Sequence, residues 1–426
     1  MSDAESAIPL DVDVLIAGGG LVGSVAAIAL GGAGLRVLLA DAEPAAERES
    51  AAYDGRSSAI AYASRQALAM LGIWPGMAGE AEPILDIRVS DGRPGEPAAP
   101  LFLHYDHRDS GLDAPFGHIV ENRAIRRALA ARLAALLPQV MVAAPARLAE
   151  VSRQPGHVEA RLEDGRRIRA RLLIAADGAR SKLRRDAGIA AAEFAYGQTG
   201  IVCTVAHELP HGGVAHEHFL PAGPFAMLPM TNYKGTDHEG RHRSSIVWTE
   251  RNARVSALLA LDDADFAAEI ERRFGDSLGR IAVLGGRWSY PLRLIHAARY
   301  ADHRLALVGD AAHAIHPIAG QGLNLGLRDV AALAEVIADA WRLGLDIGAA
   351  DVLEDYQRWR RVDSLLLIAV TDSLNRLFSN DLAPLRLARD LGLAAVDRLP
   401  PLKRLFMRHA MGAAGPRPRL LRGEPL

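Results

Sequence analysis

Residues 12–41 constrain the fold most strongly, because they combine two apolar runs with a glycine-rich turn and a helix-forming segment. The run VDVLIA at 12–17 is typical of a buried strand, and so is LRVLLA at 35–40, which ends in Asp41. The alanine-rich segment between the two runs has the composition of a helix. This order predicts a βαβ unit, in which a helix connects two parallel strands.

The glycines of this unit, Gly18, Gly20 and Gly23, have the spacing G-x-G-x-x-G. In such a turn the first glycine permits the tight bend, the second lets a pyrophosphate approach the backbone, and the third lets the helix pack closely on the sheet. Phosphates would then lie at the positive end of the helix dipole. Asp41 can bind ribose hydroxyls, which favours FAD or NAD over NADP. The alternative is a glycine-rich turn without a ligand.

Length and composition set further limits. The chain has 426 residues, a formal net charge of -2 and a single cysteine, Cys203. We expect two or three structural units, no nucleic-acid binding and, because no internal disulfide can form, a reducing cytoplasmic setting. The acidic start of the chain lacks the features of a signal peptide, and no run approaches the roughly 18 apolar residues of a membrane span.

The remainder of the chain mixes helical and strand patterns. Helical periodicity predicts helices at 121–137 and 262–274, and the chain after Gly326 is almost entirely helical in pattern. A Glu-Asp-Gly turn within 157–175 predicts a hairpin, and the β-forming residues of 197–250 predict an antiparallel sheet. We therefore expect a mixed α/β (α+β) fold with a Rossmann-like domain, an antiparallel-sheet domain and a C-terminal helical segment.

Two further motifs follow apolar, strand-like runs. ADGARSKLR occupies residues 176–184, directly after the run RLLIA at 171–175. The second motif begins with Gly309-Asp310, directly after the run LALV at 305–308, and continues as HPIAGQGLNLGLRD at 316–329. The last stretch places three glycines around the start of an expected helix.

The order of the three motifs resembles that of the group A flavoprotein aromatic monooxygenases, whose type member hydroxylates p-hydroxybenzoate. The stretch at 316–329 resembles the signature of one branch, the FAD-dependent hydroxylases of ubiquinone biosynthesis. The resemblance covers nearly the whole chain and implies a p-hydroxybenzoate-hydroxylase-like fold. The first motif is weakly specific, whereas the extended motif at 316–329 is highly specific.

For the flavin half of FAD, the resemblance implies a site built on the last motif. Asp310 would bind the ribityl hydroxyls, and Pro317 would pack beside the isoalloxazine ring. The glycines remove side chains so that backbone amides reach the pyrimidine edge, where a helix N-terminus stabilises the negative charge of the reduced flavin. The other implied residues of this turn and helix start are Gly320, Gln321, Gly322, Leu323 and Asn324.

For the pyrophosphate of FAD, the resemblance implies support from Asp177-Gly178, and Arg184 matches the trailing arginine of that family motif. Arg56 corresponds to a phosphate-contacting arginine of the family, with an ordinary surface arginine as the alternative. A polar residue before the helix at 121–137 would also contact the cofactor. The two candidates for this contact, between which the sequence does not choose, are Asn122 and Arg123.

The substrate is expected between the flavin and the sheet at 197–250. The stretch 219–230 is apolar and suits an aromatic ring that bears a hydrophobic tail, although an ordinary sheet core is the alternative. The candidate wall residues are Phe219, Phe225, Leu228 and Pro229.

The histidines invite comparison with metal sites. Alternation in a strand would put His216 and His218 on one face, and His313 lies three residues before His316. Hydrogen-bonded or solvated histidines are the favoured interpretation, and we expect no metal. Cys203 is expected to be a buried core residue.

The resemblance also implies a division of the chain into three parts. The parts are an FAD-binding domain at 10–85, 108–188 and 286–345, a substrate-binding sheet domain at 86–107 and 189–285, and a C-terminal helical segment at 346–426.

The implied activity is that of an FAD-dependent monooxygenase. Reduced FAD and O2 would form a flavin C4a-hydroperoxide, which would hydroxylate the aromatic ring of a polyprenyl phenol or benzoquinol on the way to ubiquinone. NAD(P)H or a ferredoxin system would supply the electrons. Because the flavin performs the chemistry, no catalytic side chain is expected, and Pro317, Gly320 and Gln321 would line the reactive ring. The alternatives are a hydroxylase of a soluble aromatic secondary metabolite and a catalytically silent flavin-binding scaffold.

Basic residues outnumber acidic ones from residue 398 onward, and Leu402, Leu405, Phe406 and Met407 are interleaved with them. Such a helix can lie on an anionic membrane surface, or it can cap the fold with a solvated basic face. We expect a cytoplasmic protein, and we leave open a peripheral contact at the inner face of the membrane and contacts with other ubiquinone-biosynthesis proteins.

Overall fold

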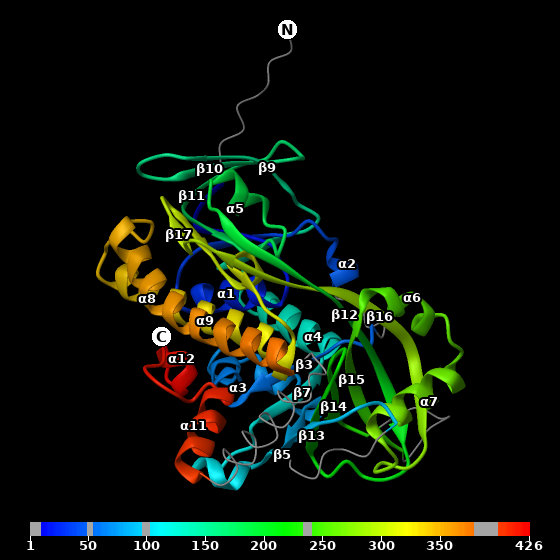
Figure 1. Cartoon of the computed structure of the whole chain (residues 1–426). Coiled ribbons are helices and arrows are strands. Elements are labelled where there is room, and N and C mark those ends of the chain that lie inside the picture. Colours follow the sequence, from blue (N-terminus) through cyan, green and yellow to red (C-terminus); the bar gives the residue numbers. More distant parts are fainter. Residues whose placement is uncertain (1–9, 49–53, 96–102, 233–240, 379–398) are drawn as a thin grey trace.

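A largely parallel sheet forms the first layer of the protein in a computed structural model (Figure 1) that describes residues 10–48, 54–95, 103–232, 241–378 and 399–426. Its strands run in the order β17 (Ala301–Asp302), β18 (Leu305–Leu307), β11 (Arg167–Ala175), β1 (Leu10–Ala17), β2 (Val37–Ala40) and β8 (Val140–Ala143). The predicted βαβ unit is confirmed, because β1 and β2 pair in parallel and α1 (Leu21–Gly32) connects them.

The hairpin predicted at 157–175 extends this sheet. β10 (Val158–Leu162) pairs in antiparallel fashion with β11 and with β9 (Leu148–Arg153). The turn between β10 and β11 contains Gly165, whose φ of 89° lies in the left-handed region that favours glycine. The sequence pattern therefore located both strands and the turn.

The second sheet contains the antiparallel strands predicted at 197–250. Its strand order is β19 (His313–Ala314), β16 (Ile281–Ala297), β12 (Ala191–His207), β15 (His242–Arg251), β14 (Gly223–Met230), β13 (Val214–Leu220), β5 (Asp86–Asp91) and β6 (Leu103–Asp106). One pairing in this sheet is parallel, between β13 and β5. Local pattern could not reveal it, because the two strands are far apart in the chain.

Helices α6 (Asn252–Leu259) and α7 (Asp263–Phe274) pack on one face of the second sheet, and α7 confirms the helix predicted at 262–274. Alternation along the strands sends large apolar side chains to this face. The bulkiest members of the resulting core are Phe225, Trp248, Phe266 and Ile270.

The opposite face of the second sheet meets a small sheet that the sequence did not predict as such. It consists of β3 (Ser57–Ala61), β7 (Gly117–Glu121) and β4 (Glu82–Ile84). Ser57 Oγ donates a hydrogen bond of 2.8 Å to Ser245 Oγ of β15, which places this contact on the side away from α6 and α7.

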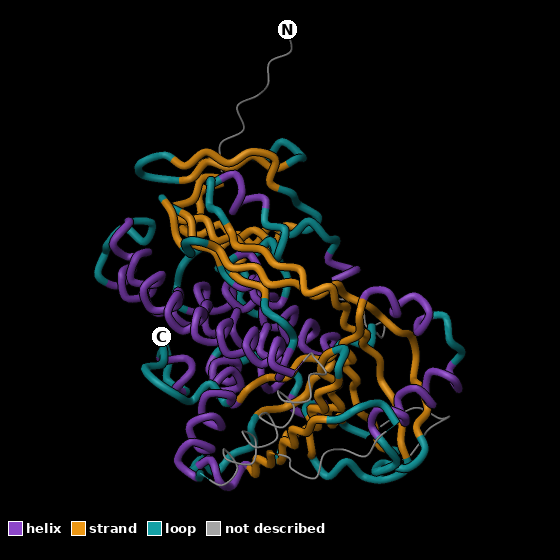
Figure 2. Tube along the Cα trace, viewed as in Figure 1, coloured by secondary structure: helices purple, strands orange, loops and turns teal. Residues whose placement is uncertain are grey.

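The helices lie beside and between the strands (Figure 2). The helix predicted at 121–137 is α4 (Asn122–Ala134), and the helical pattern after Gly326 corresponds mainly to α8 (Gln321–Arg342) and α9 (Ala350–Phe378). The remaining α-helices of the described residues are α2 (Ala45–Arg48), α3 (Tyr62–Met70), α5 (Lys182–Asp186), α11 (Pro400–Ala410) and α12 (Arg419–Arg422). Short 3-10 turns occur at Trp74–Gly76, Ala78–Glu80, His107–Ser110, Gly309–Ala311 and Ile318–Gly320.

The predicted division into three parts stays a prediction. β16 crosses the proposed boundary between 285 and 286, because it pairs with β12 along almost its whole length. Residues 1–9, at the acidic start of the chain, and 379–398, within the predicted C-terminal segment, lie outside the described residues. No helix in the described part of the chain is long and apolar enough to cross a bilayer.

A buried carboxylate joins three elements at the centre of the fold. Asp329 of α8 accepts hydrogen bonds from the backbone N–H of Gly309 (3.0 Å), from His313 Nε2 (2.6 Å) and from Arg360 Nε of α9 (2.8 Å). Its side chain is fully buried. Desolvation raises the pKa of this carboxyl, but His313 and Arg360 outweigh that effect and hold the pKa below its ordinary value.

We expect Asp329→Asn to lower the free energy of unfolding by about 3 kcal/mol, because the substitution removes the buried carboxylate that pairs with both His313 and Arg360 and leaves Arg360 with the Asp363 carboxylate alone among the described residues. Urea denaturation at pH 7 measures this. The stabilisation is present above about pH 4 and is lost as the pH falls further, because the folded pKa lies below the unfolded one. Asp355→Asn is the control, because Asp355 pairs with Arg358 on the surface. A loss as small for Asp329→Asn as for this control would contradict the prediction.

Candidate active site

A cavity of about 1060 Å³ lies at the carboxyl ends of β1, β2 and β11. Ligands of open α/β sheets bind at this edge, because the loops that follow parallel strands converge there. Seven of the residues predicted to bind the cofactor line the cavity: Gly18, Gly20, Asp41, Arg56, Asn122, Asp177 and Gly178.

The three glycines of the first motif have different surroundings. Gly18 has φ 104°, and a Cβ there would lie 2.4 Å from the carbonyl oxygen of Ala176. A Cβ at Gly23 would lie 1.9 Å from the carbonyl oxygen of Gly18, so the helix packs directly on the turn. A Cβ at Gly20 would meet nothing within 4 Å, and no side chain caps the N-terminus of α1. The turn therefore has the open backbone cradle that a pyrophosphate requires.

Two carboxylates stand at the edge of this cavity. Asp41 is buried at the end of β2, and its Oδ1 accepts a hydrogen bond from the N–H of Glu43 (3.2 Å). Asp177 Oδ2 accepts one from the N–H of Leu183 (3.2 Å), while Oδ1 is buried without a partner among the described residues. Carboxylate acceptors, an uncapped helix and an open glycine turn together fit the adenosine and pyrophosphate parts of FAD.

Of the two polar residues before α4, only Asn122 lines the cavity. Its Oδ1 accepts a hydrogen bond of 2.7 Å from Ser58 Oγ, whereas Arg123 forms an ion pair with Glu121. Arg56 lines the cavity and pairs with Asp54 at 3.2 Å.

Sequence reasoning missed Arg126, which lines the cavity and pairs with the Asp54 carboxylate at 3.0 Å. It lies one helical turn after Asn122, and side chains four residues apart share a face of a helix. That spacing is the signal that would have found it. Other basic residues of the lining that were not predicted are Arg147, Arg180 and Lys182.

Arg184 connects two of the turns at this edge rather than lining the cavity. Its buried guanidinium donates from Nη1 to the carbonyl oxygen of Ala311 (2.9 Å) and from Nη2 to that of Ala179 (3.1 Å). The turn that follows β11 is thereby fixed to the turn that follows β18.

Asp310 and residues 317–324 are not part of the lining of this cavity. Asp310 is exposed at the surface of the protein, but many protein atoms lie near its carboxyl. The resulting desolvation raises the pKa of this carboxyl, although His313 acts in the opposite direction. Gly320 has φ 61°, and a Cβ there would lie 2.8 Å from that of Ala59. A Cβ at Gly322 would meet nothing within 4 Å. The flavin-binding roles of this stretch stay predictions.

Asn324 has a structural contact in addition to its predicted role. Its Nδ2 donates to the carbonyl oxygens of Ala59 (2.8 Å) and Gly320 (3.1 Å), and its Oδ1 accepts from the N–H of Ala61 (2.8 Å). The side chain therefore joins β3 to the start of α8, which the glycine pattern alone could not reveal.

The predicted substrate wall requires a correction. Alternation puts Leu228 on the face of β14 opposite to that of Phe225 and Pro229. Phe225 is fully buried against Trp248 in the core beneath α6 and α7, so it does not share a surface with Leu228. Phe219 packs against Ile318 on the other side of the sheet. Strand pattern indicated the apolar stretch but not which side of it faces the cofactor domain.

The histidines have individual contacts. His216 and His218 lie on one face of β13, as expected: the ring of His216 contacts Phe274 of α7, and His218 Nδ1 bonds with Ser90 Oγ at 2.8 Å. The described residues contain no group of three histidine, cysteine or acidic side chains that could hold a metal ion. Cys203 is buried, and burial raises the pKa of its thiol to about 12.

A family model described as the FAD binding domain matches residues 11–362. The ubiquinone hydroxylase UbiL of Rhodospirillum rubrum is 54% identical over 417 residues, which cover 97% of this chain and 93% of that protein. The chain belongs to the FAD-dependent hydroxylases of ubiquinone biosynthesis. This family uses FAD and O2 in monooxygenation, and the electron donor stays a prediction.

Two further similarities agree with this family. The 3-demethoxyubiquinol 3-hydroxylase of Escherichia coli is 36% identical over 402 residues, covering 94% of this chain and 98% of that protein. The solved structure of p-nitrophenol 4-monooxygenase PnpA from Pseudomonas putida matches with a TM-score of 0.75 and 20% identity, covering 96% of this chain and all of that one (100%). The second match shows that this hydroxylase has the fold of the flavin-dependent aromatic monooxygenases.

We expect Gly20→Ala to lower the affinity for FAD at least tenfold, or about 1.4 kcal/mol, because the new methyl group occupies the space through which the pyrophosphate approaches. Stability should be unchanged, since Gly20 has φ -62° and a Cβ meets nothing within 4 Å. FAD titration followed by flavin fluorescence measures the affinity. Gly32→Ala, which adds a methyl group in open space at the far end of α1, is the control. Equal affinities of the two variants for FAD would contradict the role of the glycine turn in binding the pyrophosphate.

Proposed function

We propose that this hydroxylase adds one oxygen atom to the aromatic ring of a polyprenyl phenol or benzoquinol intermediate of ubiquinone, using FAD and O2. The observation that carries the proposal is the contact of Phe219 with Ile318. It brings the apolar side of the second sheet against the HPIAGQG turn, to which the resemblance assigns the flavin ring. The ubiquinone hydroxylase named among its relatives supports the choice of substrate class.

The cofactor would be held in two places. The glycine turn and Asp41 would bind the pyrophosphate and ribose, while Asp310 and the first turn of α8 would hold the ribityl chain and ring. When bound, FAD supplies the reduction and oxygen chemistry. The protein would orient the flavin ring, and the positive end of the α8 dipole, at the N-terminus of that helix, would favour negative charge at the pyrimidine edge. The apolar sheet excludes water from the reacting centre. NAD(P)H or a ferredoxin system would deliver the electrons.

Isotope incorporation tests this function. Purified protein is loaded with FAD and supplied with the donor, ¹⁸O-labelled O2 and a short-chain prenylated phenol. We expect a yellow protein and a product that contains one ¹⁸O atom, with kcat/KM at least tenfold higher for the prenylated phenol than for its counterpart without the tail. Donor oxidation that yields hydrogen peroxide and no hydroxylated product would contradict the function, as would a protein that binds no FAD.

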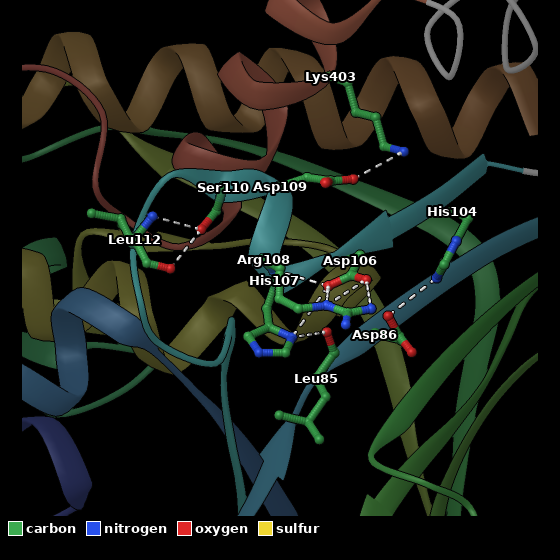
Figure 3. A network of polar contacts seen from close by, with 10 residues as sticks. All are labelled: Leu85, Asp86, His104, Asp106, His107, Arg108, Asp109, Ser110, Leu112 and Lys403. Carbon is green, nitrogen blue, oxygen red and sulfur yellow. Dashed lines mark hydrogen bonds and ion pairs between the residues drawn. The ribbon is translucent and has the colours of Figure 1, made fainter.

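A membrane contact through α11 is a separate part of the proposal. The basic residues of α11 are engaged in part with the protein: Lys403 Nζ lies 3.8 Å from the Asp109 carboxylate (Figure 3), and Arg408 Nε donates to the carbonyl oxygen of Ser110 (3.3 Å). Met407 is buried beneath the helix. Leu405 and Phe406 remain 54% and 41% exposed beside the exposed Arg404. Apolar and basic side chains together suit an anionic membrane surface.

Replacing Leu405 and Phe406 together by glutamate should reduce binding to vesicles that contain anionic phospholipid by at least tenfold, because apolar burial is lost and negative charge repels the surface. Co-sedimentation with the vesicles measures the binding. Leu209→Glu is the matched control, since Leu209 is also 50% exposed but lies beyond β12. If the double variant and the wild type sediment equally, the membrane contact is wrong.

A further inference from the structure

Glu217 is a carboxyl group in the middle of β13 that none of the roles above uses. In the strand register it lies between Val89 of β5 and Ala226 of β14. Its neighbours His216 and His218 point to the side of α7, where His216 contacts Phe274. Because side chains alternate along a strand, Glu217 points to the opposite side, which is the side of the cofactor domain.

The residues on this side of β13 connect Glu217 to the HPIAGQG turn. Phe219, two positions further on the same face, packs against Ile318 of that turn. Ala215, two positions before, packs in an apolar cluster with Met230 and Ile84. Glu217 therefore stands between two apolar contacts, on the wall that would face the substrate under the proposed function.

No structural partner accounts for this carboxyl. Glu217 has no hydrogen bond or ion pair with any described residue, and desolvation alone raises its pKa to about 8. The residue nevertheless keeps part of its surface accessible. A carboxyl placed in apolar surroundings without a partner costs stability, so such a group is a candidate for binding a ligand.

Two other charged groups on this face have partners of their own. Asp91, at the end of β5 beside Phe219, accepts a hydrogen bond from the N–H of Gly92 (3.1 Å). Arg243 of β15 donates to the Glu121 carboxylate at 2.8 Å. Neither contributes to the shifted pKa of Glu217, and the adjacent side chains on β5 and β14 are apolar.

We propose that Glu217 binds the phenolic hydroxyl of the aromatic substrate and takes up its proton during hydroxylation, an inference that rests on the proposed function. The phenolic O–H bond breaks and a carboxyl O–H bond forms, while the electron pair stays on the phenolic oxygen and increases the electron density of the ring. The donor supplies two electrons through FAD, one oxygen atom of O2 enters the ring, and the other leaves as water after taking up a proton. After the C–O bond forms, Glu217 returns its proton to the phenolic oxygen, and the displaced ring hydrogen leaves as a proton to solvent.

Substrate binding to oxidised holoenzyme tests this role without turnover. The change in FAD absorbance is titrated with a short-chain prenylated phenol and with its O-methyl ether. We expect the wild type to bind the phenol at least tenfold more tightly and Glu217→Leu to lose this preference, because only the wild type can pair with the hydroxyl. An unchanged preference in Glu217→Leu would overturn the proposal.

Stability and pH dependence separate this role from a structural one. Glu217→Leu should unfold at the same or a higher temperature, since it removes a desolvated carboxyl that has no partner among the described residues. In the wild type, kcat/KM should rise with pH up to about 8, and Glu217→Gln should lose this rise. A marked loss of stability in Glu217→Leu would instead indicate a structural role.

A control variant on the same strand, and a measurement of product, separate the role of Glu217 from the proposed function. His216→Gln alters the adjacent position on the other face of β13 and should leave the phenol preference intact. If the wild type prefers the phenol but forms no hydroxylated product, the proposed function fails while the binding role of Glu217 stands. If product forms, but Glu217→Leu keeps the preference for the phenol and Glu217→Gln keeps the pH profile, the role of Glu217 is wrong while the proposed function stands.

Discussion

The charge-assisted contacts of Asp329 determine where the last motif lies. This single carboxylate holds the turn after β18 through Gly309, strand β19, which precedes the HPIAGQG stretch at 316–322, through His313, and α9 through Arg360. A low local dielectric strengthens such contacts and makes each partner costly to remove. The position of Asp310, one residue after Gly309, depends on this anchor.

Three turns lie at one edge of the first sheet because each follows one of three neighbouring parallel strands. β1, β11 and β18 are parallel neighbours, so the glycine turn, the Asp177 turn and the Asp310 turn emerge side by side. Close backbone approach between Gly18 and Ala176 leaves no room for a side chain, and Arg184 links the second turn to the third. Motifs far apart in the sequence are thus brought together by strand order alone.

The sequence predicted those parts of the fold that depend on local pattern. The βαβ unit, the hairpin before Asp177 and helices α4 and α7 follow from periodicity and turn chemistry. The parallel pairing of β13 with β5 and the sheet containing β3 depend on contacts between distant segments, so periodicity did not reveal them. In the site, the glycines were readily recognised because their spacing is characteristic. Arg126 and the side of β14 that carries Phe225 required the three-dimensional arrangement.

Strands β12 and β16, each of 17 residues, run along one another and belong to the second sheet while ending beside the first (Figure 1). Two paired strands of this length resist bending, because bending them breaks backbone hydrogen bonds. The register of the pair is interrupted between Ala195 and Thr199, where Gly197 has φ 69°, and again between Val202 and Thr204. Bending between the two sheets would therefore concentrate at these two interruptions. Under the proposed function, a substrate with a hydrophobic tail would enter by local adjustment of the second sheet rather than by free rotation about a hinge.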